Sequence, residues 1–261
     1  MDRSWDDSEG WSAGAPDDWD SDDWEEYFAG PEDCGIESLS DSYDEPEFDE
    51  SGDFVELSVR DESIAAQRHF STNVQISNPN VYHLTSLANL QRIGEGGAIL
   101  PPNEISRVQS LGWSHLIDKG QTRQVPVAPG GTLADYVRFY FTPFTPYSWH
   151  VGKRPDRASH VLIVVPIRRL LGVPCLVTNC NALANGAVFH PGSDFEKVVD
   201  WDAVQSSYSS TNKHLRQAEL LVRGPVPTDR IGGVLTRTPK TANDAAMIGF
   251  PMARVDARVF Y

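Results

Sequence analysis

The chain has 261 residues and a formal net charge of −15, because 37 acidic residues outnumber 22 basic ones. The charge is unevenly spread: residues 1–75 hold 24 of the acidic residues and 3 of the basic ones. The remainder is mildly basic and can attract phosphate, so the overall charge does not exclude a nucleic-acid partner. We expect two parts, an acidic N-terminal tail over residues 1–75 and one folded domain over residues 76–261.

Membrane, export and metal functions find no support in the sequence. No run of about 18 apolar residues occurs, so no membrane span is expected. The N-terminus is acidic where a secretory signal needs a basic start and an apolar core, which favours a cytoplasmic protein. We expect free thiols and no metal, because no metal or disulfide spacing joins the three cysteines, Cys34, Cys175 and Cys180.

The acidic tail has the composition of a disordered segment. Asp, Glu, Ser and Gly dominate it, and no period of 2 or 3.6 runs through it, so burial cannot offset its ordering entropy. Aromatic residues are threaded among its acids: Trp5, Trp11, Trp19, Trp24 and Tyr27. Acidic groups interleaved with flat rings are similar to the phosphates and bases of a single nucleic-acid strand. Two interpretations stay open: the tail occupies a nucleic-acid groove of the body, or it is a solvated tail that binds another partner or none.

The first predicted elements of the body follow a turn at residues 78–80. Residues 81–85 are typical of a short strand. Thr85 or Ser86 can cap a helix of about two turns, which we expect to end at the glycines of residues 96–97.

Helix and strand patterns alternate along the rest of the body. A second helix is expected over residues 102–115, followed by a polar, basic loop that contains Lys119 and Arg123. A third is expected over residues 195–204. Aromatic and β-branched runs predict strands over residues 136–141, 161–167, 173–178, 217–222, 231–236 and 257–261. Short strands with scattered helices predict an α+β domain.

One carboxylate stands in an otherwise apolar strand pattern. Alternation places Gln217, Glu219 and Leu221 on one face of that strand. Burying a carboxylate without a partner is costly, so Glu219 is expected to be paired, to face solvent or to take part in chemistry. The strand pattern alone leaves these alternatives open.

Four fragments occur in one order along the body. They are YHLT at residues 82–85 with NL at 89–90, PGGTLADYVRFYF at 129–141, TNCN at 178–181 and RQAELLV at 216–222. In this combination and spacing, residues 78–261 resemble the DarT family of DNA ADP-ribosyltransferase toxins. The acidic tail lies outside the resemblance.

The resemblance implies both a fold and a reaction. The fold would be that of an ADP-ribosyltransferase, with central antiparallel or mixed β-sheets and flanking helices. The reaction would transfer ADP-ribose from NAD, consumed as a substrate, to a base in single-stranded DNA, and the base is left open. The resemblance also implies a toxin whose antitoxin partner carries an ADP-ribosyl-hydrolysing macrodomain.

Residue roles are implied where the motifs match. Glu219 falls on the family's catalytic glutamate. His83, Thr85 and Asn89 fall on positions that bind NAD, and Asn181 falls on a turn that lines the active site.

The chain departs from the family at three places. The family's arginine in the loop before Pro-Gly-Gly would fall near Gly120, so Arg123 or Lys119 has to take its role, and Arg123 is preferred. Arg138 stands where the family usually has a proline, and residues 143–147 differ from the usual segment. These changes bear on the acceptor more than on the reaction.

A DNA acceptor would have to be single-stranded, because the pairing edge of a base is inaccessible inside a duplex. Aromatic and basic side chains that could stack bases and follow phosphates include Arg138, Tyr147, Lys153 and Arg154. Two rival functions stay open. One is the same reaction on RNA or protein, and the other is a non-catalytic nucleotide- or DNA-binding module restrained by the acidic tail.

Overall fold

The computed structural model describes residues 79–105, 111, 114–205 and 213–260. The predicted acidic tail lies outside these residues. Among the described residues, no helix is both long and apolar enough to cross a membrane.

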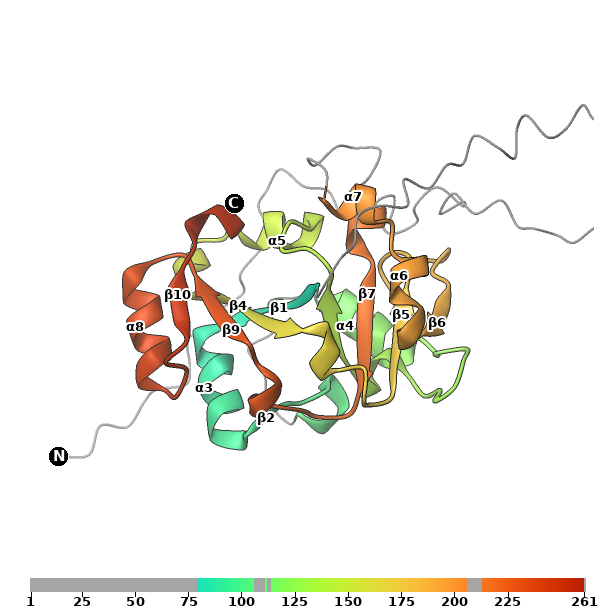
Figure 1. Ribbon diagram of the computed structural model, residues 1–261, viewed down its shortest axis with the longest axis horizontal. Coiled ribbons are helices and arrows are strands. Elements are labelled where there is room, and N and C mark those ends of the chain that lie inside the picture. Colours follow the sequence, from blue (N-terminus) through green and yellow to red (C-terminus); the bar gives the residue numbers. More distant parts are fainter. Residues whose placement is uncertain (1–78, 106–110, 112–113, 206–212, 261) are drawn as a thin grey trace, which may run out of the picture.

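A large mixed sheet organises the described part of the chain (Figure 1). Its strand order is β10-β9-β4-β1-β3-β7-β5-β6, and a separate two-stranded sheet joins β2 to β8. Only β9 and β10 pair in parallel within the large sheet. The strands are β1 (Asn80–Ser86), β2 (Ala98–Ile99), β3 (Tyr136–Tyr140), β4 (His160–Pro166), β5 (Cys175–Thr178), β6 (Phe189–Pro191), β7 (Glu219–Arg223), β8 (Val226–Pro227), β9 (Gly233–Thr236) and β10 (Ala253–Val255).

Helices flank this sheet, so the predicted α+β class and the expected flanking helices are confirmed. In Figure 1, α3 and α8 lie near the β9 and β10 side, and α6 lies near β5 and β6. The helices are α3 (Leu87–Gly96), α4 (Ser114–Thr122), α5 (Pro146–Val151), α6 (Phe195–Val198), α7 (Trp201–Gln205) and α8 (Pro239–Met247).

The centre of the sheet contains a weak seam between β1 and β3. β1 pairs with β4 along its whole length, but with β3 at a single position, Tyr82↔Tyr140. Tyr140 also pairs with Glu219 on β7, which in turn pairs with Thr178 on β5. The seam therefore lies in the same row of residues as the carboxylate that stood out in the sequence.

The first helix begins and ends as its sequence predicts. The Ser86 hydroxyl accepts a hydrogen bond from the backbone N–H of Asn89, and Gly97 ends the helix with φ 74°. A left-handed residue at this position favours glycine. Leu90 and Ile93 are buried in the main core, which fixes the helix against the sheet.

Three predicted elements are wrong in extent or type. Only a 3₁₀ turn, Pro102–Glu104, forms at the start of the expected helix at 102–115, of which residues 106–110 and 112–113 are not described. Lys119, expected in a loop, lies in α4. The expected strand at 257–261 is instead a 3₁₀ turn over Ala257–Val259, preceded by β10, and residue 261 lies outside the described part.

Two further predictions need correction near the candidate carboxylate and the third helix. Gln217 ends the 3₁₀ helix Leu215–Gln217, so it does not share a strand face with Glu219; β7 begins at Glu219 itself. The expected helix over 195–204 is divided into α6 and α7, because Val199 leaves the helical conformation with ψ 127°. The helices α5 and α8 and the strand β6 had no counterpart among the sequence predictions.

Candidate active site

Glu219 is fully buried at the first position of β7. Its backbone N–H donates to Thr178 Oγ1 at 3.3 Å. The Thr178 hydroxyl donates in turn to the Cys180 carbonyl at 2.7 Å, which ties the strand start to the turn after β5. The backbone at Glu219 is therefore fixed from the strand beside it.

The partner of this carboxylate is Arg138, on the neighbouring strand β3. Arg138 Nε donates to Glu219 Oε2 at 2.8 Å, and Arg138 Nη2 donates to Glu219 Oε1 at 2.6 Å. Burial alone would lower the pKa of Arg138, but the charge and hydrogen bonds of Glu219 outweigh it, and the pKa is raised. A two-point guanidinium–carboxylate pair is among the strongest charged contacts a protein makes. Of the alternatives that the sequence left open, Glu219 is paired.

One amide side chain contacts the ion pair, and a second amide contacts the first. Arg138 Nη2 also reaches Asn181 Oδ1 at 3.4 Å. The same oxygen accepts from the backbone N–H of Leu183 at 2.9 Å, while Asn181 Nδ2 donates to Gln217 Oε1 at 3.4 Å. Asn181 and Gln217 are both buried. The structure therefore brings Asn181 to Arg138, the partner of Glu219, and brings Gln217, to which the sequence analysis gave no site role, to Asn181. A role for Asn181 in the active site stays a prediction.

His83 lies across the seam between β1 and β3. Its Nδ1 is 2.9 Å from the Arg138 carbonyl oxygen, and its ring packs 5.7 Å from the ring of Phe139. Burial lowers the pKa of His83 from its ordinary value; the bond to the carbonyl opposes this shift and the Arg138 charge adds to it. A carbonyl only accepts, so Nδ1 carries the hydrogen and Nε2 of the neutral ring keeps its lone pair. His83 can therefore accept a hydrogen bond from a hydroxyl group.

Thr85 and Asn89 lie just beyond His83, where β1 passes into α3. Both side chains are buried, and Asn89 Nδ2 donates to Thr85 Oγ1 at 3.2 Å. Asn89 Oδ1 accepts from Arg92 Nη1 at 3.4 Å. These contacts order the start of α3 next to His83. A role in NAD binding stays a prediction for both residues.

Arg123 contacts the turn that carries Asn181. Arg123 follows α4, and its Nη2 donates to the Ala184 carbonyl at 3.4 Å. The backbone N–H of Ala184 donates to the Asn181 carbonyl at 2.9 Å, which closes this turn. Arg123 Nε is buried without a hydrogen-bond partner. No contact of the Lys119 ammonium group with this turn is found among the described residues, so the geometry favours Arg123.

The predicted nucleic-acid residues fall into two groups. Tyr147, on α5, lies 6.4 Å from the ring of Tyr140, and burial raises its pKa to about 12 although the charges of Arg138 and Arg154 act against the shift. It lies beside the ion pair. Lys153 instead lies over the Trp149 ring, with Nζ 3.4 Å from the centroid.

Arg154 is partly engaged within the chain. Its Nη1 donates to the Leu111 carbonyl at 3.1 Å, and its Nε is 3.5 Å from Asp156 Oδ1. A phosphate would have to share or replace these contacts. Contact with nucleic acid stays a prediction for Arg138, Tyr147, Lys153 and Arg154.

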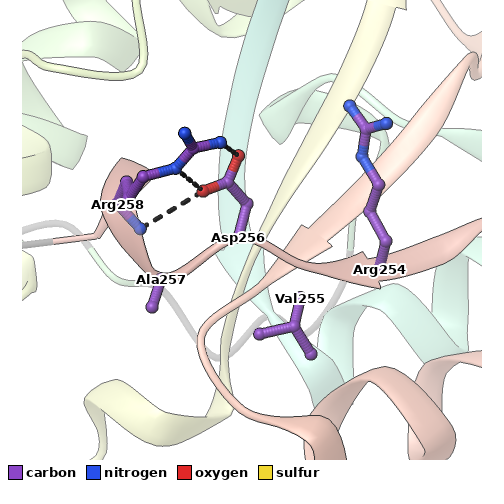
Figure 2. Close-up of a pocket in the computed structure, with 5 residues that line it drawn as sticks. All are labelled: Arg254, Val255, Asp256, Ala257 and Arg258. Carbon is purple, nitrogen blue, oxygen red and sulfur yellow. Dashed lines mark hydrogen bonds and ion pairs between the residues drawn. The ribbon is translucent and has the colours of Figure 1, made fainter.

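An open concavity of about 470 Å³ lies at the opposite end of the sheet (Figure 2). It is lined by residues 254–258, and Arg258 binds both carboxylate oxygens of Asp256, at 2.9 and 3.0 Å. Strand β10 enters it, and β9, β4, β1 and β3 lie between β10 and β7. The concavity is therefore separate from the Glu219 site, and its two-point ion pair offers a matched control for experiments on that site. No group of three or more potential metal ligands is found among the described residues.

His83→Gln should flatten part of the pH dependence of stability. Below the ordinary histidine pKa, the unfolded chain binds a proton that half-buried His83 in the folded chain accepts less readily, so folding loses stability as pH falls from about 6.5 through the lowered pKa. The pKa values of His150, His160 and His214 are also lowered by burial, and their contributions remain in the variant. Urea unfolding at pH 7 and pH 5 measures the change. An equal loss of stability in both proteins would contradict a lowered pKa for His83.

The chain is similar to known proteins over most of its described residues. The family model described as "ssDNA thymidine ADP-ribosyltransferase, DarT" matches residues 82–258. A DNA ADP-ribosyl transferase of Thermus aquaticus is 29% identical over 181 residues, which cover 66% of this chain and 82% of that protein.

Solved structures show the same fold. The Thermus sp. 2.9 DarT in complex with ADP-ribosylated ssDNA has a TM-score of 0.64 at 24% identity, covering 70% of this chain and 96% of that one. Its complex with NAD⁺ has a TM-score of 0.61 at 24% identity, with coverages of 70% and 98%. Thermosipho africanus DarTG in complex with ADP-ribose has a TM-score of 0.60 at 19% identity and covers 70% and 51%.

The family model and the DNA ADP-ribosyl transferase relative thus define the class of this protein, an ADP-ribosyltransferase. With most of its described residues matched by the family model, this chain belongs to the DarT family, as its motifs implied. It is a DNA ADP-ribosyltransferase.

Proposed function

We propose that this chain transfers ADP-ribose from NAD to the base of a thymidine in single-stranded DNA, with Glu219 at the reacting centre. The observation that carries the proposal is the fully buried Glu219 carboxylate, held at two points by Arg138. It is supported by the description of the matching family and by the Thermus relative bound to ADP-ribosylated ssDNA.

A buried carboxylate suits the bond changes of this reaction. The bond between ribose C1′ and the nicotinamide nitrogen breaks, and nicotinamide leaves with the electron pair. The ribose develops positive charge, which the Glu219 carboxylate stabilises, and a base nitrogen attacks C1′. Glu219 then accepts the proton that this nitrogen loses. General-base assistance of this kind contributes about 10²–10⁴-fold, and oriented charge adds to it.

The remaining side chains suit the binding of NAD. The lone pair at His83 Nε2 can accept a hydrogen bond from a ribose hydroxyl, and Asn181 is held beside Arg138, the partner of Glu219. Arg123, whose guanidinium contacts the turn of Asn181, is proposed to bind the diphosphate through charge-assisted hydrogen bonds. Thr85 and Asn89, which follow His83 in the chain, are also proposed to contact NAD.

The DNA strand is proposed to approach over α5. Tyr147 lies beside the ion pair, while Lys153 covers the half-exposed ring of Trp149 close to Arg154. Aromatic rings can stack bases and cations can follow phosphates. Binding should therefore weaken as salt rises.

A set of matched oligonucleotides tests the acceptor. The full-length chain and NAD would be incubated with four strands: DNA with one thymidine, the same DNA with cytidine in its place, the matching duplex, and RNA with uridine. Intact mass should show one ADP-ribose on the first strand only. Modification of the cytidine strand would contradict thymidine, and modification of RNA or of protein would support the rival acceptors.

We infer further that the chain is the toxin of a toxin–antitoxin pair and acts in the cytoplasm. Its motifs resemble a toxin family, and the Thermosipho relative carries the name DarTG. The proposed partner is an antitoxin whose macrodomain removes ADP-ribose. Induced expression should arrest bacterial growth, and co-expression of a macrodomain hydrolase active on ADP-ribosylated DNA should restore it. Equal growth with the wild-type chain and the Glu219→Gln variant would contradict a toxin.

The catalytic domain is proposed to span residues 76–261, with the acidic tail as a competitor for DNA. Deleting residues 1–70 should raise both activity and affinity for single-stranded DNA, because 24 acidic residues precede residue 76. Fluorescence anisotropy with a labelled oligonucleotide measures the affinity. If activity and affinity both stay unchanged, the tail does not compete with DNA.

A further inference from the structure

Arg138 and Glu219 behave in this structure as one unit. We propose that Arg138 is a positioning residue that fixes the Glu219 carboxylate for transfer and occupies only one lone-pair position on each of its two oxygens. The inference rests on the proposed role of Glu219 and extends it to a residue that sequence analysis expected on DNA.

The hydrogen-bond geometry leaves the carboxylate usable. A carboxylate has about four lone-pair positions on its two oxygens. Arg138 Nε and Nη2 each occupy one of them, at 2.8 and 2.6 Å. One position on each oxygen therefore accepts no hydrogen bond from Arg138. Because Glu219 is fully buried, a ribose hydroxyl or a base N–H reaches these positions only when the side chains that cover them move. Glu219 can accept both without breaking the ion pair.

Burial makes Arg138 necessary for holding Glu219. Glu219 is fully buried, whereas the Arg138 side chain keeps 26% of its surface exposed. Removing the guanidinium would leave a buried charge without its main partner, which is strongly unfavourable. The carboxylate would then turn towards solvent or take up a proton, and either change removes it from the reacting position.

Arg138 is itself fixed from three sides. β3 pairs with β7 residue for residue, from Tyr136↔Arg223 to Tyr140↔Glu219. The Arg138 carbonyl accepts from His83 Nδ1, and its Nη2 reaches Asn181 Oδ1. The proposed ribose-binding His83 and the carboxylate are thus linked through one arginine. A guanidinium engaged in this way acts through Glu219 rather than as a freely moving phosphate contact.

A double-mutant cycle on the full-length chain tests the proposal. The variants are Arg138→Gln, Glu219→Gln and the double variant, and the readout is the single-turnover rate of transfer to a thymidine-containing DNA strand at saturating NAD. Arg138→Gln should slow transfer by about 10²-fold or more, with a smaller change in KM for NAD. Because Arg138 acts through Glu219, the double variant should be no slower than Glu219→Gln alone.

Two further variants distinguish a rate lost because Glu219 is misplaced from a rate lost because the protein unfolds. Arg138→Lys keeps one charged donor and should recover part of the lost rate. The double variant replaces the charged pair by two amides and leaves no buried charge without a partner. It therefore provides a folded protein for comparison if Arg138→Gln unfolds. Arg258→Gln breaks the similar two-point pair with Asp256 at the far end of the sheet, and it should leave transfer unchanged.

The outcomes distinguish this inference from the proposed function. Unchanged or faster transfer by Arg138→Gln would overturn the positioning role, and faster transfer would show that the ion pair blocks Glu219. A double variant slower by the product of both single effects would also overturn it, because Arg138 would then act on the substrate independently. Normal transfer by Glu219→Gln would instead refute the proposed function itself.

Discussion

Glu219→Gln should reduce ADP-ribose transfer by about 10³-fold or more, the largest effect expected of any single substitution in the site. Glutamine has nearly the same shape as glutamate but carries no negative charge and cannot accept the proton of the attacking nitrogen. Both proposed contributions of Glu219 are lost together, which corresponds to about 4 kcal/mol in the activation barrier. Release of nicotinamide and modification of DNA, measured in the same reaction, give the rate.

The control for this variant is another paired carboxylate. Asp256→Asn removes a carboxylate that Arg258 binds at two points, but at the opposite end of the sheet. It should retain the wild-type rate. Circular dichroism shows whether Glu219→Gln stays folded. A folded Glu219→Gln protein that still transfers ADP-ribose within a factor of a few would contradict the assignment of the reacting centre.

Phe139→Ala should be the most destabilising of the simple core substitutions near the site. Phe139 is fully buried on β3 between the main core and the ring of His83. Truncating a buried phenylalanine costs about 3–5 kcal/mol, because apolar contacts are lost and a cavity remains. A domain of this size should then lose roughly 10 °C in Tm. Urea and thermal unfolding measure the two quantities.

A graded series of variants distinguishes the stability lost to a cavity from the stability lost to any substitution. Phe139→Leu keeps much of the volume and should cost less than half as much, about 1–2 kcal/mol. Met247→Ala removes a side chain that is 85% exposed on α8 and should change stability by less than about 0.5 kcal/mol. Equal losses for the alanine and leucine variants of Phe139 would contradict its tight packing against His83.

Local sequence signals predicted those parts of the fold that local physics decides. The Ser86 cap and the glycines at 96–97 defined the first helix, and the apolar runs at 136–141 and 161–167 predicted β3 and β4. Errors arose where tertiary contacts override the local pattern. Gln217 continued an alternating pattern but ends a 3₁₀ helix, and its side chain turns to Asn181.

The candidate site was predicted as residues but not as a geometry. Motif resemblance selected Glu219, His83 and Asn181, and the structure connects all three through Arg138. The partnership of Arg138 and Glu219 was missed because the residues are 81 positions apart in the chain. Their contact depends on the pairing of β3 with β7, which no local pattern encodes. One indication of this contact was present in the sequence: a carboxylate without a local partner stood in one apolar strand pattern, and an arginine stood in another.

A crystal structure of the folded Glu219→Gln variant with NAD tests the central claim most directly. Slow turnover in this variant should keep NAD intact. The nicotinamide ribose should lie within hydrogen-bond distance of the residue 219 side chain and of His83 Nε2, with Arg123 near the diphosphate. NAD bound instead in the concavity at residues 254–258, with the Glu219 region empty, would contradict the account.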